Sequence, residues 1–129
     1  MTGRRHVSSG SPYESTIGFS RAVRVGDRIV VAGTGPVWPD GSCPADAEAQ
    51  ARRCLDIIGE ALAEAGGGPA DVIRTRMFLT DVGDADAVGR AHSERFADVR
   101  PAATMVVVAA LFDPRWRVEI EAEAIVGEG

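Results

Sequence analysis

The stretch VEIEAEAIVG, residues 118–127, places Glu119, Glu121 and Glu123 at alternate positions with small apolar residues between them. Successive side chains of a β-strand point to opposite faces of the sheet. The pattern therefore predicts a strand over 116–126 with three carboxylates on one face and apolar groups on the other. A solvated face is one explanation for such a row, and pairing with cations of a neighbouring strand is another.

Working outward from this stretch, hydrophobic periodicity predicts four more strands and two helices. The pair Gly26-Asp27 suits the tight turn of a hairpin. Asp84 suits a helix N-cap, and the run from Gly66 to Pro69 suits a helix end. The predicted order is β-β-α-β-α-β-β, with strands near 19–25, 28–33, 72–80, 103–110 and 116–126 and helices near 47–65 and 84–97.

The order of these elements predicts the fold class. Each helix connects two strands, and right-handed crossovers between parallel strands place both helices on one face of the sheet. The class is thus α+β, with a single mixed β-sheet and two helices packed on one face. The strand TMVVVAA, residues 104–110, is apolar on both sides, which is typical of a strand buried on both faces.

Two helices can cover only one face of this sheet, so the other needs a different cover. A second copy of the chain is the simplest one. Arg74 and Arg76 alternate with apolar residues on their strand and would share the uncovered face with Glu119 and Glu121. We therefore expect the acidic row to pair with arginines in a subunit interface.

Composition and charge narrow the class of protein. Residues 1–129 fit one domain, with 45% hydrophobic and 26% charged residues and a net charge of -5. This charge argues against nucleic acid as a partner. No apolar run is long enough for a membrane span, and MTGRRHVSSG lacks the apolar segment of a secretory signal. Cys43 and Cys54 match no metal-binding or redox spacing. The sequence predicts a soluble, cytoplasmic protein with no bound metal.

Several blocks of the chain resemble the Rid family (reactive intermediate deaminases, YjgF-like, also called endoribonuclease L-PSP). They cover nearly the whole sequence: VGDRIVVAGTGPV, ADAEAQARRCLDII, RTRMFLTDV, RPAATMVVV and VEIEAEAIV. The resemblance implies the chorismate-mutase-like fold and a homotrimer with a cleft between subunits. It also implies hydrolysis of 2-imino acids or their enamine tautomers to 2-oxo acids and ammonia, without a cofactor.

The same resemblance assigns site residues and shows where this chain departs from the deaminase branch. The arginine that clamps the substrate carboxylate stands two residues after the proline of the penultimate strand, and here that position is Ala103. A guanidinium fork matches a carboxylate in bidentate geometry, so its loss removes an anchor. The glutamate that positions water is retained as Glu119. Four further polar positions are replaced: the family's serine, tyrosine, asparagine and cysteine are Ala32, Phe19, Gly89 and Met105.

We therefore take Glu119 as the candidate catalytic residue. Candidate substrate-binding residues are Phe19, Ala32, Gly33, Thr34, Arg76, Ala103, Met105 and Glu121. Arg74 or Arg76 could replace the missing clamp, although pairing with the glutamates is the simpler role. Gly33 and Gly35 would let the backbone approach a cleft, while His92 is expected to be a hydrogen-bonded core or interface residue. Trp38 and Trp116 could anchor an interface.

Three hypotheses follow from these residues. The first is an atypical imine or enamine deaminase that uses Glu119 and has a diverged substrate. The second is a non-catalytic protein that binds a small metabolite in the trimer clefts. The third, a ribonuclease or translation inhibitor, is disfavoured by the net charge of -5.

Overall fold

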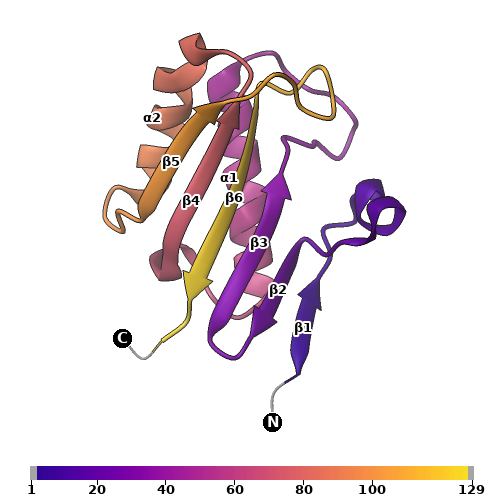
Figure 1. Ribbon diagram of the computed structural model, residues 1–129, viewed down its shortest axis with the longest axis vertical. Helices are drawn as coiled ribbons and strands as arrows, with labels where there is room; N and C mark the ends of the chain where they lie inside the picture. Colours follow the sequence, from indigo (N-terminus) through magenta and orange to yellow (C-terminus); the bar gives the residue numbers. More distant parts are fainter. Residues whose placement is uncertain (1–2, 128–129) are drawn as a thin grey trace.

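The computed structural model describes residues 3–127 and contains one six-stranded sheet with both main helices on the same side (Figure 1). Strand β4 runs parallel to β5, and the other neighbouring pairs are antiparallel. The sheet order is β1-β2-β3-β6-β4-β5. Its elements are β1 (Arg4–Val7), β2 (Ala22–Val25), β3 (Arg28–Thr34), α1 (Ala47–Glu64), β4 (Val72–Leu79), α2 (Ala85–Phe96), β5 (Ala102–Val107) and β6 (Val118–Ile125).

The predicted hairpin glycine, helix-end glycine and N-cap residue lie at their expected positions, although the predicted N-cap makes no cap bond. Gly26 has a φ of 62° in the turn between β2 and β3, and Gly66 has a φ of 89° just after α1. Both values favour glycine, because a β-carbon disfavours the left-handed region. The Asp46 side chain accepts a hydrogen bond from Ala49 N at 3.0 Å and caps α1. Asp84 stands at the N-cap of α2 but makes no cap bond, since its carboxylate pairs with Arg117.

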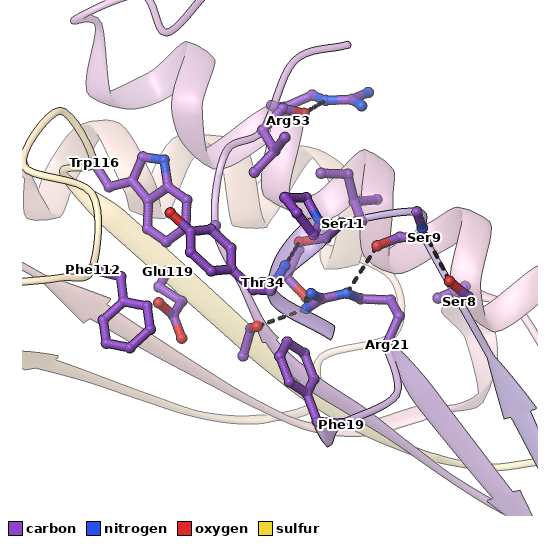
Figure 2. Close-up of a pocket in the computed structure, with 18 of the residues that line it drawn as sticks. Ser8, Ser9, Ser11, Phe19, Arg21, Thr34, Arg53, Phe112, Trp116 and Glu119 are labelled. Atoms are coloured by element: carbon purple, nitrogen blue, oxygen red, sulfur yellow. Dashed lines mark hydrogen bonds between the residues drawn. The ribbon is translucent and has the colours of Figure 1, made fainter. Parts of the chain in front are cut away.

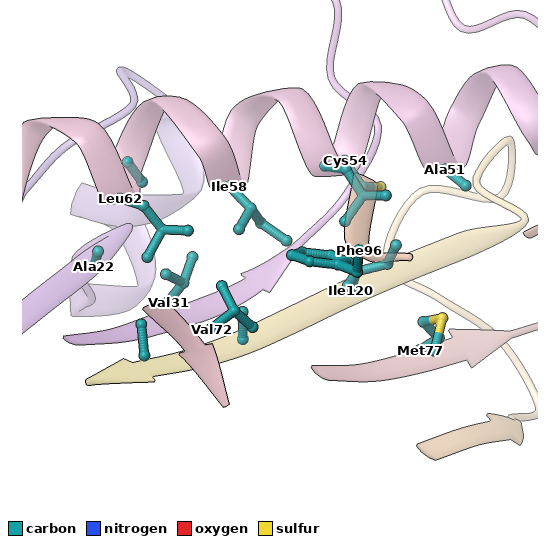
Figure 3. Packing of buried hydrophobic residues seen from close by; sticks show 14 of the residues in the cluster. Ala22, Val31, Ala51, Cys54, Ile58, Leu62, Val72, Met77, Phe96 and Ile120 are labelled. Carbon is teal, nitrogen blue, oxygen red and sulfur yellow. The ribbon is translucent and has the colours of Figure 1, made fainter. Parts of the chain in front are cut away.

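The core lies between the two helices and one face of the sheet, as predicted (Figure 3). Residues of β6 alternate between buried and half-buried, so Ile120 and Ala122 point to the helices while the glutamates point away. α1 contributes the long apolar stripe expected from its 3.6-residue period. The largest fully buried apolar side chains include Ile29, Leu55, Ile58, Leu62, Leu79 and Ile120.

The N-terminal part of the chain differs from the prediction. The predicted order lacks β1, which pairs with β2, and it lacks the π-helical turn η1 at Glu14–Gly18. Four residues, RRHV, are too few to show a period, so pairing with β2 rather than sequence pattern defines this strand. β2 also begins at Ala22, not near residue 19. Residues 8–21 therefore form no strand, and they contain only the short turn η1.

Strand β5 is the edge of the sheet, although its pattern predicts burial on both faces. Val106 and Val107 point to opposite faces and are 42% and 53% exposed. The strand ends at Val107, before the predicted limit of residue 110. Within one chain, β5 is therefore not buried on both faces, and its burial by another copy of the chain stays a prediction.

The helix-free face carries the charged row in the predicted arrangement. Register places Glu121 beside Arg76, and their side chains form an ion pair with Arg76 Nη1 at 2.6 Å from Glu121 Oε1. Arg74 lies beside Glu123, but Glu123 pairs with Arg28 on β3 instead. The pairing predicted for Arg76 is confirmed, and the one predicted for Arg74 is wrong because a third strand supplies a competing cation.

Two further features concern the described part of the chain as a whole. Within residues 3–127 no helix has the length and apolar character needed to span a bilayer. Cys43 and Cys54 are both free, and Cys54 is buried in α1.

Candidate functional site

A cavity of about 720 Å³ opens where β3 ends and β6 begins. Its walls come from segments far apart in sequence: the N-terminal segment 7–21, the residues after β3, one edge of α1, and the loop that precedes β6. Figure 2 shows the labelled side chains around this space, with Glu119 and Arg21 among them. Its volume lies within the usual range for small-molecule sites, about 300–1,000 Å³.

Glu119 is the carboxylate of the β6 row that faces this cavity. It lies against the backbone of Gly33, so close that a β-carbon at position 33 would overlap Glu119 Oε2. Gly35 has the same role for Trp116, because a β-carbon there would lie 2.5 Å from Trp116 Cη2. The two glycines of the GTGP sequence thus allow an acid and an indole to lie on the backbone.

Glu119 differs from the other two glutamates of its row in having no partner. Glu121 pairs with Arg76 and Glu123 with Arg28, whereas no residue in the described range 3–127 makes a hydrogen bond or ion pair with the Glu119 carboxylate. Burial raises its pKa above the usual 4.5, and the charge of Glu121 adds to this, while the charge of Arg21 lowers it. A carboxylate with a raised pKa is well suited to move protons near neutral pH.

Arg21 is a buried cation in the wall of the same cavity. Its Nη1 donates to Gly33 O at 2.7 Å and to Thr34 Oγ1 at 3.1 Å, and its Nε donates to Ser9 Oγ at 3.3 Å. Its guanidinium also lies over the Phe19 ring, 5.2 Å from the centroid. Burial lowers the pKa of Arg21, and the charges of Glu14 and Glu119 oppose that effect. Arg21 and Glu119 thus both lie against Gly33 and carry opposite charges.

Glu14 holds Arg21 and the N-terminal segment in place. Its Oε2 lies 3.7 Å from Arg21 Nε, and it accepts hydrogen bonds from Ser8 Oγ at 2.8 Å and Ser9 N at 3.1 Å. Burial raises the pKa of Glu14, but the hydrogen bonds from Ser9 and Ser8 and the charge of Arg21 outweigh it and lower the pKa overall. These hydrogen bonds and the ion pair hold the serine-rich segment in place beside the cavity.

Aromatic rings form the opposite wall. The Tyr13 ring lies 5.8 Å from Phe112 and 6.2 Å from Trp116, the latter edge-on at 79°. Such tilted and edge-to-face contacts are favourable arrangements of aromatic pairs. Trp116 is 8% exposed, whereas Phe112 is 71% exposed at the mouth. Trp38 also lines the cavity, so both tryptophans, proposed from sequence as interface anchors, lie at this site.

The structure divides the candidate residues into three groups. Glu119, Phe19, Gly33 and Thr34 line the main cavity. Ala32, Arg76 and Glu121 line a smaller hollow of about 210 Å³ on the helix-free face, together with Arg74. Ala103 and Met105 lie on β5 and line neither space.

Ala103 and Glu119 point to opposite faces of the sheet. Ala103 is in register with the buried Thr75 on the helix side, whereas Glu119 is in register with Phe78 on the helix-free side. One chain therefore does not place both in a single site. His92, nearby on α2, makes a 2.8 Å hydrogen bond between its Nε2 and Thr75 Oγ1, as expected of a core histidine, and burial lowers its pKa.

Sequence reasoning missed Tyr13 and Arg21, which line the cavity, and Glu14, which pairs with Arg21 behind it. The resemblance placed Phe19 at the family's tyrosine position, but Tyr13 brings a phenol to the same cavity. The Ser-Pro-Tyr-Glu sequence before η1 is the signal that could have drawn attention to this segment. Within residues 3–127, no three His, Cys, Asp or Glu side chains are grouped so as to hold a metal ion.

Comparison with known proteins places the chain in a family. The profile of the endoribonuclease L-PSP family matches residues 10–126. The chain belongs to this family, the YjgF or Rid proteins. A Rid-family crystal structure from Mycobacterium tuberculosis is 46% identical to it, with a TM-score of 0.89 and coverage of 96% of this chain and 100% of that one.

Two further relatives have descriptions that bear on chemistry. The 2-iminobutanoate/2-iminopropanoate deaminase of Escherichia coli is 35% identical, over 83% of this Rid chain and 84% of the deaminase. The crystal structure of TdcF from the same organism, with bound serine, is 28% identical, with a TM-score of 0.80, and the match covers 95% and 94% of the two chains. The family and the fold inferred from the sequence are thus confirmed.

Proposed function

We propose that this Rid protein is a cofactor-independent hydrolytic deaminase that acts on a small imine or enamine, with Glu119 positioning and deprotonating the attacking water. One observation carries the proposal: Glu119 is the carboxylate of the β6 row that is left without a partner, and it faces a cavity of ligand size. The related Escherichia coli protein is named as a deaminase of 2-imino acids, which supports the reaction class.

The reaction adds water across a carbon–nitrogen double bond. Glu119, as the carboxylate, takes a proton from water while the oxygen attacks the imine carbon. Glu119 passes this proton to the imine nitrogen, which gives a neutral carbinolamine. Glu119 then takes the proton of the carbinolamine hydroxyl and delivers it to the amine nitrogen as the carbon–nitrogen bond breaks, so that a carbonyl forms and ammonia leaves. A general base and acid of this kind contributes about 10²–10⁴ in rate, and a pKa nearer the working pH improves both steps.

The proposed active form is a homotrimer with a cleft between subunits. Ala103 and Glu119 face opposite sides of the sheet in one chain, so a site that contains both family positions needs a second copy. The exposed β5 edge and the helix-free face are the surfaces that such a copy would cover. We place this assembly in the cytoplasm, following the sequence.

The alternative is a non-catalytic protein that binds a small metabolite in the same cavity. Three substituted positions favour it, because Ala103, Ala32 and Gly89 all lack the polar groups of the deaminase branch. Cleavage of RNA, which the family description names, is disfavoured by the net charge of -5.

Ammonia release from imines generated in situ by an amino acid oxidase decides between the enzyme and the binding protein. We expect wild type to exceed the spontaneous rate with at least one imine, and Glu119→Gln to lose the excess. Glu123→Gln is the matched control, because Glu123 lies on the same face of β6 but outside the cavity. Absence of activity with every imine would favour the binding protein.

A further inference from the structure

Aromatic residues are concentrated at the cavity rather than in the core. Both tryptophans, the only tyrosine and two of the four phenylalanines line it, namely Tyr13, Phe19, Trp38, Phe112 and Trp116. Within residues 3–127, Phe96 is the only aromatic residue of the hydrophobic core cluster, and Trp116, also buried, lies at the cavity instead. Folding alone would place rings in the core, where they bury most area. Their position here indicates a surface made for a ligand.

Three of these rings, Tyr13, Phe112 and Trp116, form one group in the wall of the cavity. The indole of Trp116 is fixed against Gly35, and Tyr13 meets it edge-on. Phe112 extends from the loop before β6, 71% exposed, and completes the wall at the mouth (Figure 2). An aromatic ring of a ligand gains both apolar burial and favourable ring contacts in such a setting, whereas a methyl or ethyl group gains neither to the same extent.

Arg21 offers a charged group to the same ligand. Its Nη1 and Nε are used within the chain, but within residues 3–127 no partner bonds to its Nη2. Every fully buried side-chain nitrogen or oxygen of this range has a partner, so Nη2 must keep some accessible surface, and the cavity is the space that Arg21 lines. A guanidinium nitrogen with free donors suits a carboxylate.

We propose that the substrate is a 2-imino acid with an aromatic side chain, whose ring lies against Tyr13, Phe112 and Trp116 and whose carboxylate is bound by Arg21 in place of the arginine absent at Ala103. The substrate part rests on the proposed deaminase function. With the carboxylate at Arg21 and the ring at the aromatic wall, the imine carbon lies near Glu119, because Arg21 and Glu119 both contact Gly33.

Binding of product analogues tests the pocket independently of turnover. Phenylpyruvate should bind about tenfold or more tightly than 2-oxobutyrate, and its methyl ester should bind about tenfold or more weakly than the acid. Calorimetry gives the affinities, and quenching of tryptophan fluorescence reports occupation beside Trp116 and Trp38. Equal affinity of acid and ester would overturn the role of Arg21, and a preference for 2-oxobutyrate would overturn the aromatic specificity.

Variants assign these preferences to residues. Phe112→Ala should reduce the preference for phenylpyruvate by about three- to tenfold, whereas Val82→Ala, an equally exposed apolar residue outside the cavity, should leave it unchanged. Arg21→Met should remove the difference between acid and ester. If Arg21→Met fails to fold, the comparison of acid and ester on wild type still decides. Loss of assembly without loss of ligand preference in Phe112→Ala would show that the ring serves the interface, against the proposal.

The deaminase assay separates failure of this inference from failure of the proposed function. Imines are generated from phenylalanine and from 2-aminobutyrate, and their kcat/KM values are compared. We expect the phenylalanine imine to be preferred about tenfold. Equal or reversed preference with clear turnover overturns the aromatic class and leaves the deaminase. Tight phenylpyruvate binding without turnover of either imine overturns the deaminase and leaves the ligand class.

Discussion

At the scale of single residues, the site depends on one unpaired carboxylate and on the glycine beneath it. Glu119 is placed by a strand whose other two glutamates are neutralised by arginines. Its environment is made by burial and by Arg21. Gly33 provides the room for this carboxylate on the backbone.

Glu119→Gln should make the protein more stable at neutral pH while removing activity. Burial raises the pKa of Glu119 from 4.5, so the folded chain binds that proton more tightly than the unfolded chain. The ionised form therefore lowers the free energy of unfolding above the raised pKa, and this penalty disappears as pH falls below about 4.5. Thermal melts should show a higher Tm for the variant at pH 7 and nearly equal values at pH 4.

The activity of wild type should depend on pH in the matching direction. A general base must be ionised, so the rate should rise with pH through the raised pKa of Glu119, which lies above 4.5. For the stability prediction, an increase in Tm of Glu119→Gln over wild type that is equally large at pH 4 and at pH 7 would show that the ionised carboxylate is not the destabilising group.

Gly33→Ala should impair the site and the fold together. The new methyl group would overlap Glu119 Oε2, so the carboxylate must move or the backbone must shift. Overpacking of this kind costs about 1–3 kcal/mol, and a displacement of about 1 Å in a catalytic group can cost a factor of about 100 in rate.

Gly59→Ala is the matched control for Gly33→Ala. Gly59 lies inside α1, and its nearest contact to a new β-carbon would be Arg95 Nη1 at 3.6 Å. Alanine there should stabilise the protein by about 0.5–1 kcal/mol through helix propensity. Urea unfolding and the imine assay, run on both variants, check the pair. Full activity in Gly33→Ala would mean that Glu119 does not need its position on this backbone.

At the scale of elements, β6, β3 and α1 each contribute residues to the site and hold them in place. The register between β3 and β6 shifts between Val31 and Thr34, which is the part of β3 beside Glu119. α1 supplies one edge of the cavity and is fixed by its N-cap and by its contact with the sheet. The loop before β6 brings Trp116 and Phe112 over the same opening.

Asp46→Ala should weaken α1 without changing the chemistry. The carboxylate caps the helix through Ala49 N, and loss of such a cap costs about 0.5–2 kcal/mol. Asp46→Asn should recover most of that stability, because asparagine is also a good N-cap. Chemical denaturation measures the change, and kcat/KM should stay within about twofold because Asp46 does not line the cavity. A cost equal in the alanine and asparagine variants would contradict the capping role.

At the scale of the whole molecule, a single chain leaves two surfaces uncovered. One is the β5 edge, and the other is the helix-free face with Arg76, Glu121 and the smaller hollow. Light scattering should report three chains in solution. A monodisperse monomer at micromolar concentration would contradict the proposed interface and the shared cleft.

Arg76→Ala should lower the stability of this assembly more than Arg52→Ala. In one chain the two arginine side chains are 42% and 45% exposed, so a clear difference between them requires the helix-free face to be buried by another copy. Removing one partner of a buried ion pair costs about 3–5 kcal/mol. Melting curves and light scattering at several concentrations measure the effect, and equal shifts would show that the face is open to water.

Ala103→Arg should restore part of the missing anchor in the assembled protein. The variant should bind 2-oxobutyrate more tightly than wild type, because a charge-assisted hydrogen bond contributes about 1.5–3 kcal/mol when aligned. Turnover of 2-iminobutyrate, which we expect to be barely above the spontaneous rate in wild type, should recover only in part. Calorimetry and the imine assay test both. Efficient turnover by wild type would contradict a diverged site.

The sequence by itself determined the fold class, the helix-free face, and the shared face of Glu119, Glu121 and Glu123. These features are local or periodic: alternation fixes which side chains share a face, and turn and cap residues fix where elements end. The pair of Arg76 and Glu121 followed from such alternation. β1 did not, since four residues show no period and pairing with β2 defines the strand.

Tertiary structure decided which residues surround Glu119 and in which direction its pKa is shifted. Tyr13 and Arg21 precede Phe112 by more than 90 residues in the sequence, so they meet it only after folding. The exchange of Arg74 for Arg28 beside Glu123 has the same cause, since a neighbouring strand brings in a competing cation. Burial and contacts between distant segments set the pKa of Glu119, the choice of Arg28 as the partner of Glu123, and the shape of the cavity, and the periodicity of the sequence gives none of these three.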